Sequence, residues 1–208
     1  MLRFRLIAVV AAAIALTACF SGGLRPGEGG QQRWQLSGKI GLRTPHLAES
    51  AYLNWRQCDD SFSVRISGPL GQTVARIDGR GDRLTLQFEG RGPVTTSEPE
   101  ALMQQQLGWS LPISALRYWV RAEAAPGGDA EFSGPQQQPN TLRQQNWQVD
   151  YLAYHQNGAT ILPAKLRLNR DGLIRSDEGS GNENLQATLL INEWLLCDAT
   201  DCPHTLMH

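Results

Sequence analysis

A short segment near the start of the chain carries the residues best suited to covalent chemistry. Leu16-Thr17-Ala18-Cys19 places a cysteine directly after one apolar residue and two small ones. Small residues let a signal peptidase approach the backbone, and the thiol of a cysteine at this position can carry a diacylglycerol. The spacing therefore predicts cleavage before Cys19 and attachment of a lipid to its sulfur.

The residues around this box support the same interpretation. Arg3 and Arg5 precede an apolar run over 6–15, which is shorter than the roughly 20 residues of a lasting transmembrane helix. We predict a signal peptide over 1–18 and, from its five glycines and one proline, a flexible lipidated tether over 19–32. The alternative is an ordinary secretory signal followed by a chance cysteine.

Residue 20 bears on the destination of the protein. In bacterial lipoproteins an aspartate directly after the lipidated cysteine usually means retention in the inner membrane, and this chain has Phe20 there. By resemblance to that sorting rule, we expect a lipid anchor on the periplasmic face of the outer membrane.

Three further cysteines are available for redox or metal chemistry. An oxidising compartment permits pairing, and Cys197 with Cys202 is the predicted local disulfide, although Cys58 with Cys197 stays open. The Cys-x4-Cys-Pro-His run is half of a metal site at most, because no matching ligands stand elsewhere at a suitable spacing. We therefore predict no metal and no cofactor other than the lipid on Cys19.

The sequence offers little support for catalysis or nucleic-acid binding. Neither G-x-S-x-G nor H-E-x-x-H occurs, and Asp177 with Glu178 stands in a Gly/Ser/Asn-rich stretch typical of a solvated loop. A net charge of −1 argues against nucleic acid as a partner. These features favour a protein that is not an enzyme.

The elements that position these residues are mostly strands. Apolar and polar residues alternate with a period of two, which predicts half-buried antiparallel strands, over 34–42, 51–55, 62–66, 84–88, 147–151, 162–168 and 185–191. Hairpins of the type I′ kind are predicted at Asp78-Gly79, Asn157-Gly158 and Asp171-Gly172. Short strands at short spacing predict a sandwich or a barrel.

Two amphipathic helices interrupt the strands between Ser97 and Arg121. A capping box with proline in the first turn begins the first helix at Ser97-Glu98-Pro99-Glu100, and Gly108 is its predicted end. The second begins near Pro112, and its predicted apolar stripe consists of Ile113, Leu116, Trp119 and Val120. The helices are the available cover for an apolar sheet face, so we predict one mainly β, α+β domain over 33–196, with an extension over 197–208.

In this order the elements resemble the LolB family, outer-membrane lipoproteins that receive other lipoproteins from the periplasmic carrier LolA. The resemblance rests on the box ending at Cys19, the loop Ser67-Gly68-Pro69-Leu70-Gly71, the stretch from Gly108-Trp109 to Tyr118-Trp119, and Asn192-Glu193-Trp194-Leu195-Leu196. It implies an unclosed antiparallel β-barrel, capped by helices, around an apolar cavity for acyl chains. The implied protein is a monomer that accepts triacylated lipoproteins from LolA and inserts them into outer-membrane lipid.

This resemblance also implies two sets of site residues. A large apolar residue at a turn tip, Leu70 between Pro69 and Gly71, is expected to enter the bilayer. Residues from the strands and helices are expected to line the cavity, with plain core packing as the alternative for each: Trp55, Ile66, Leu86, Met103, Leu107, Leu116 and Trp119. A sensor that binds acyl chains without passing cargo on remains the alternative function.

Overall fold

The computed structural model describes residues 33–81, 83–107, 109–170, 185–197 and 202. The predictions for the signal peptide, Cys19, Phe20, the tether, Gly108 and the loop over 171–184 lie outside these residues. No helix of the described part is both long and apolar enough to cross a membrane.

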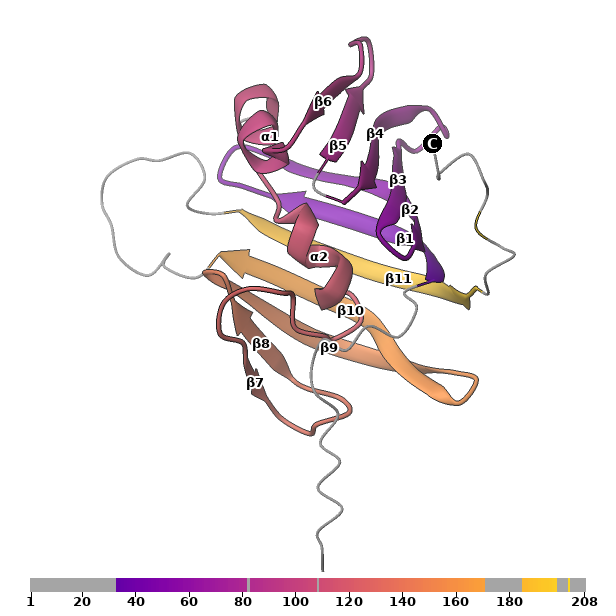
Figure 1. Ribbon diagram of the computed structural model, residues 1–208, viewed down its shortest axis with the longest axis vertical. Helices are drawn as coiled ribbons and strands as arrows, with labels where there is room; N and C mark the ends of the chain where they lie inside the picture. The colour runs from indigo at the N-terminus through magenta and orange to yellow at the C-terminus, as the bar shows by residue number, and fades with distance from the viewer. Residues whose placement is uncertain (1–32, 82, 108, 171–184, 198–201, 203–208) are drawn as a thin grey trace, which may run out of the picture.

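Eleven antiparallel strands form one sheet, and two helices lie on one of its faces (Figure 1). The strands are β1 (Arg33–Arg43), β2 (Ala48–Cys58), β3 (Ser61–Ser67), β4 (Thr73–Arg80), β5 (Arg83–Phe88), β6 (Val94–Thr96), β7 (Glu131–Ser133), β8 (Thr141–Gln144), β9 (Trp147–Asn157), β10 (Thr160–Arg170) and β11 (Gln186–Leu196). The helices are α1 (Pro99–Leu107) and α2 (Ile113–Trp119).

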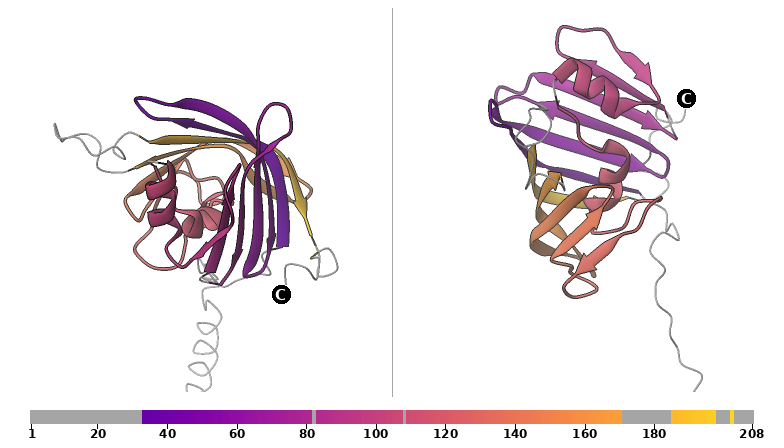
Figure 2. Two further views of the ribbon diagram at one scale, coloured as in Figure 1. Left: turned by 90° about the horizontal axis from the view of Figure 1, so that it is seen from above. Right: turned by 90° about the vertical axis from the view of Figure 1, so that its left-hand side faces the viewer.

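The strand order explains why the helices cover the sheet. The order is β6-β5-β4-β3-β2-β1-β11-β10-β9-β8-β7, so β6 and β7 form opposite edges. The chain between those edges carries α1 and α2 and crosses the concave face, inside the curve of the sheet (Figure 2). The sheet curls without closing, which confirms the predicted α+β fold with an unclosed barrel and a helical cap.

The alternation that predicted the strands is the alternation of burial. In β1, Trp34, Leu36 and Ile40 are buried on the concave face, while their neighbours are at least partly exposed. At Gly38 an added Cβ would overlap the Leu190 carbonyl, because β1 and β11 approach closely where the register shifts. All seven predicted strands are present, and β4, β6, β7 and β8 are additional.

The predicted hairpins had different outcomes. The prediction of a turn at Asp78-Gly79 was wrong, because both residues belong to β4 and pair with residues of β5. The strand ends at Arg80, and Gly81 follows it with φ +58°. An added Cβ on Gly79 would overlap the Phe62 ring, so packing rather than turning requires this glycine. Asn157 does end β9, and Gly158 at φ +61° begins the turn to β10.

Both predicted helices are present. Pro99 opens α1, where its missing N–H is unimportant, and the Leu102 N–H donates to the Glu98 carbonyl at 3.1 Å. At the end of α2 Ala122 is left-handed at φ +60° and the Glu123 N–H donates back to the Tyr118 carbonyl at 3.2 Å. This arrangement satisfies carbonyls at the helix end.

Aromatic side chains fill the interior at one end of the sheet. Trp34 lies between Trp55 and Trp194, with ring centroids 5.4 and 5.3 Å apart, and Phe62 packs on Trp55 at 5.9 Å. Their strands place all four rings at the end where Cys58 finishes β2. Aromatic packing therefore fills the interior at this end of the sheet.

Candidate functional site

An apolar cavity of about 410 Å³ lies between the sheet and the helices. Its size is within the roughly 300–1,000 Å³ of ligand pockets. Strands β1–β5 and β11 contribute one wall, and α1, α2 and the segment between them contribute the other. Six of the predicted residues line it: Trp55, Ile66, Leu86, Met103, Leu107 and Leu116.

The exposure of the lining residues shows where the cavity opens. Deep in the cavity, Leu53, Trp55 and Leu86 are buried. The exposed lining residues stand at the other end, among them Glu49 near the start of β2 and Gln72 in the turn between β3 and β4. The mouth therefore lies at the end opposite the aromatic rings.

The turn between β3 and β4 forms part of this mouth. Gly68, Pro69 and Gln72 line the cavity, while Leu70 is 94% exposed. The turn is closed by its own backbone, because the Gly71 N–H donates to the Gly68 carbonyl at 3.0 Å and Gly71 has φ +84°. Leu70 therefore projects into solvent beside the mouth on a turn that holds its shape without it.

Trp119, the seventh predicted lining residue, does not line the cavity. It is fully buried at the end of α2, and its indole N–H donates to the Gln144 side-chain carbonyl at 2.9 Å. That carbonyl also accepts the Ala125 N–H at 2.8 Å, and the Gln144 amide donates to the Ala125 carbonyl at 2.8 Å. Helical spacing placed Trp119 on the apolar stripe, but its N–H requires a polar partner in the core.

A second contact holds the same end of the helix. The Tyr151 hydroxyl donates to the Trp119 carbonyl at 2.9 Å. Burial raises the pKa of Tyr151 well above its ordinary value, so the hydroxyl keeps the proton that it donates. Gln144 and Tyr151 together join the end of α2 to β8 and β9, so this end is the fixed end of the helical cap.

We expect Gln144→Leu to lower the free energy of unfolding by about 3 kcal/mol, because it leaves three buried polar groups without partners. Chemical denaturation followed by tryptophan fluorescence measures the change. The control is Gln156→Leu, an exposed position on the neighbouring β9, where less than about 1 kcal/mol is expected. Equal effects at the two positions would contradict the role given to Gln144.

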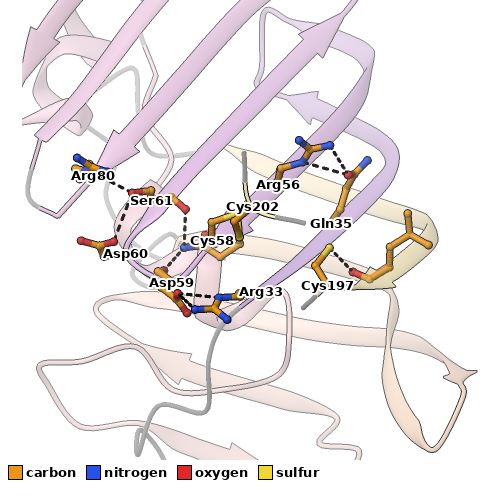
Figure 3. The surroundings of a disulfide bond; sticks show 12 residues. Arg33, Gln35, Arg56, Cys58, Asp59, Asp60, Ser61, Arg80, Cys197 and Cys202 are labelled. Carbon is orange, nitrogen blue, oxygen red and sulfur yellow. Dashed lines mark hydrogen bonds and ion pairs between the residues drawn. A yellow bond between two sulfur atoms is a disulfide. The ribbon is translucent and has the colours of Figure 1, made fainter. Parts of the chain in front are cut away.

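The disulfide joins Cys58 to Cys202, with Cα atoms 5.8 Å apart (Figure 3). The prediction of a Cys197–Cys202 pair was wrong, because Cys202 is bonded to Cys58 instead. The Cys197 N–H donates to the Arg33 carbonyl at 3.0 Å, and Arg33 pairs with Cys58, so β1 lies between Cys197 and Cys58. Cys197 and Cys58 are therefore two strand spacings apart, roughly 10 Å, and this distance exceeds the reach of a disulfide. The alternative Cys58–Cys197 pair is excluded as well.

We expect Cys202→Ser to lower the free energy of unfolding by about 2–4 kcal/mol, because the bond closes a loop spanning 144 positions. Thermal unfolding under oxidising and reducing conditions measures this loss, which the reductant should reproduce in the unsubstituted protein. Cys197→Ser is the control and should change stability little. A stable Cys202→Ser protein together with an unstable Cys197→Ser protein would contradict the pairing.

Sequence reasoning missed several residues of the site. Trp109, Leu111 and Ile113 line the cavity from α2 and the segment before it, and Ile77 and Phe88 line it from β4 and β5. Ile113 lies on the predicted helical stripe, so the signal was present. Ile77 was missed together with its strand, and nothing in the sequence marked Trp109 as part of a wall.

The comparisons with known proteins agree with this arrangement. The family model described as "Outer membrane lipoprotein LolB" matches residues 32–194. The chain is 40% identical over 162 residues to an outer-membrane lipoprotein LolB of Stutzerimonas stutzeri, covering 77% of this chain and 73% of that one. It is 39% identical over 168 residues to another of Chromohalobacter salexigens, covering 80% and 72%.

Solved structures show the same fold at low identity. A LolA superfamily protein from Nitrosomonas europaea superposes with a TM-score of 0.51 at 11% identity, covering 86% of this chain and 91% of that one. A DUF1329 family protein from Desulfovibrio piger gives 0.56 at 5% identity, covering 86% and 90%. The family match, extending over nearly all of the described strands, identifies this chain as a member of the LolB family of outer-membrane lipoproteins.

Proposed function

We propose that this protein accepts lipoproteins from a soluble periplasmic carrier of the LolA type and inserts them into the outer membrane. The observation that carries the proposal is the apolar cavity whose mouth lies beside the exposed Leu70. The cavity would hold acyl chains, and the loop would bring the mouth to the bilayer. The family supports a role in lipoprotein localisation.

Shielding of acyl chains explains why such a cavity is needed. Each buried methylene contributes about 0.8 kcal/mol, so three chains with some forty methylenes hold on the order of 30 kcal/mol of membrane affinity. Cargo therefore moves downhill, from the carrier to a receptor that binds it better and then to the membrane. We expect this transfer to need no covalent step and no cofactor.

The size of the cavity implies that the cap moves when cargo enters. A methylene is about as large as a water molecule, roughly 30 Å³, so forty of them need on the order of 1,200 Å³. The cavity of about 410 Å³ holds a part of this. Because Gln144 and Tyr151 hold the end of α2, we infer that α1 moves away from the sheet.

The lipid on Cys19 would keep the receptor at its destination. The proposed domain begins near Arg33, where β1 starts, and the tether over 19–32 would connect the two. The anchor holds the protein at the membrane while the domain carries the cavity and the loop.

A two-step assay tests the proposed function. A carrier loaded with a triacylated lipoprotein is mixed with this protein, and cargo is first pulled down with it and then recovered in added liposomes. We expect cargo in both fractions. Binding of acyl chains without release to liposomes would favour the sensor, and binding of neither would remove the receptor role.

A further inference from the structure

The outer face of the sheet, opposite the cavity, holds a groove of about 860 Å³ that extends from β1 to β6. Of the described residues that line it, five are exposed arginines and one, Asp78, is a carboxylate. We call it the outer arginine groove, after Arg56, Arg65, Arg76, Arg80 and Arg83. In a protein of net charge −1 this is a local concentration of positive charge.

The strand register brings like charges together in this groove. Arg65 pairs with Arg76 across β3 and β4, and Arg80 pairs with Arg83 across β4 and β5. Like charges directly opposite each other destabilise a sheet. The arrangement is therefore unfavourable for folding alone, and an anion bound between the guanidinium groups would offset the repulsion.

The five arginines differ in the partners that their guanidinium groups have. Arg76 pairs with Asp78 at 2.7 Å. Figure 3 shows Arg80, which donates to the Ser61 hydroxyl at 3.2 Å. Arg65 and Arg83 form no side-chain hydrogen bond or ion pair within the described part of the chain. A guanidinium offers two parallel N–H donors to a phosphate, so the groove suits phosphate groups.

The groove continues to the exposed turn. Arg65 and Arg76 also line a second hollow of about 460 Å³, which extends to Val74 and Arg91 beside the base of the Leu70 turn. Glu89 is the carboxylate among the described residues of this hollow. Exposed arginines therefore lie on the two strands that the Leu70 turn joins.

We propose that the outer arginine groove binds the phosphates of anionic phospholipids, so that this face lies on the membrane while Leu70 enters it. The inference rests on the proposed delivery to membranes. A lipid surface is favoured over an acidic protein because the groove is continuous with the turn at the cavity mouth. An anionic surface attracts each nearby arginine by about 1 kcal/mol, or roughly fivefold in affinity.

The test compares two pairs of substitutions in the mature chain with Cys19→Ala, which contains every described element. Arg65→Gln with Arg83→Gln removes one charge from each opposed pair. Arg143→Gln with Arg170→Gln removes two exposed arginines from β8 and β10, outside the groove. Binding is measured by sedimentation with vesicles of phosphatidylcholine with and without phosphatidylglycerol, at low and high salt.

We expect Arg65→Gln with Arg83→Gln, the groove pair of substitutions, to weaken binding to vesicles that contain phosphatidylglycerol by roughly 25-fold. The thermal stability of this variant should be unchanged or higher. The control pair should weaken it by less than about fivefold, and high salt should weaken all binding. Equal losses in the two pairs, or strong binding to phosphatidylcholine alone, would overturn the proposal.

Two other outcomes keep this proposal separate from the transfer function. Normal vesicle binding by the groove pair, with cargo no longer accepted from the carrier, would mean that the groove docks an acidic protein, and it would overturn the lipid site. Normal vesicle binding with normal transfer would also overturn the lipid site while the receptor function stands.

Discussion

Replacing Leu70 with glutamate should abolish delivery of cargo to membranes while leaving its acceptance from the carrier intact. Leu70 is 94% exposed on a turn closed by its own backbone, so the change should alter stability by less than about 1 kcal/mol. A carboxylate at the tip would resist entry into the bilayer. The two-step assay measures both stages in one experiment.

Two control variants show whether position or polarity matters. Leu70→Met keeps an apolar side chain and should deliver normally. Leu152→Glu puts the same charge at an apolar position on β9 that is 44% exposed and should also deliver normally. Normal delivery by Leu70→Glu would remove Leu70 from the mechanism, and with it the reason to prefer an inserter over a passive lipid binder.

A charge on the cavity wall should block acceptance of cargo more than it lowers stability. Met103 is buried on α1 and lines the cavity, so an aspartate there would face the cavity space rather than closed core packing. We expect Met103→Asp to lower the free energy of unfolding by about 2 kcal/mol and to lose most cargo in the pull-down step.

The matched control for this variant is Leu166→Asp. Leu166 is fully buried on β10 and, unlike Met103, does not line the cavity. An unpaired charge there should lower the free energy of unfolding by more than about 4 kcal/mol and unfold much of the protein. If Met103→Asp unfolds the domain as completely, Met103 is core and the cavity is not a site.

Local patterns were sufficient to predict most of the fold. The long strands alternate apolar and polar residues along their length, because one face packs and the other meets solvent. β4 was missed because Ala75, Ile77 and Gly79 face inward, and only one of them is a large apolar residue. β6 and β7 have three residues each and are too short to show a recognisable alternation of apolar and polar residues.

The candidate site could be predicted in part. Helical spacing predicted Met103 and Leu116 as lining residues. Leu70 could be predicted because it is a large apolar residue in a short turn of Gly and Pro. Whether an apolar residue packs in the core or lines a cavity depends on the space left between two layers. That space depends on distant segments, which explains why Trp119 was misplaced and Trp109 was missed.

The sequence by itself determined the strand and helix types, the chemistry at Cys19 as an expectation, and the family resemblance, because each depends on residues close together in the chain. Only the tertiary structure decided the Cys58–Cys202 bond, the Gln144 contacts and the opposed arginines. The Gln144 contacts and the opposed arginines depend on register between strands, and the disulfide depends on the return of the chain beyond β11 to the end of β2. A shift of one residue in register would move Gln144 or these arginines to the other face of the sheet.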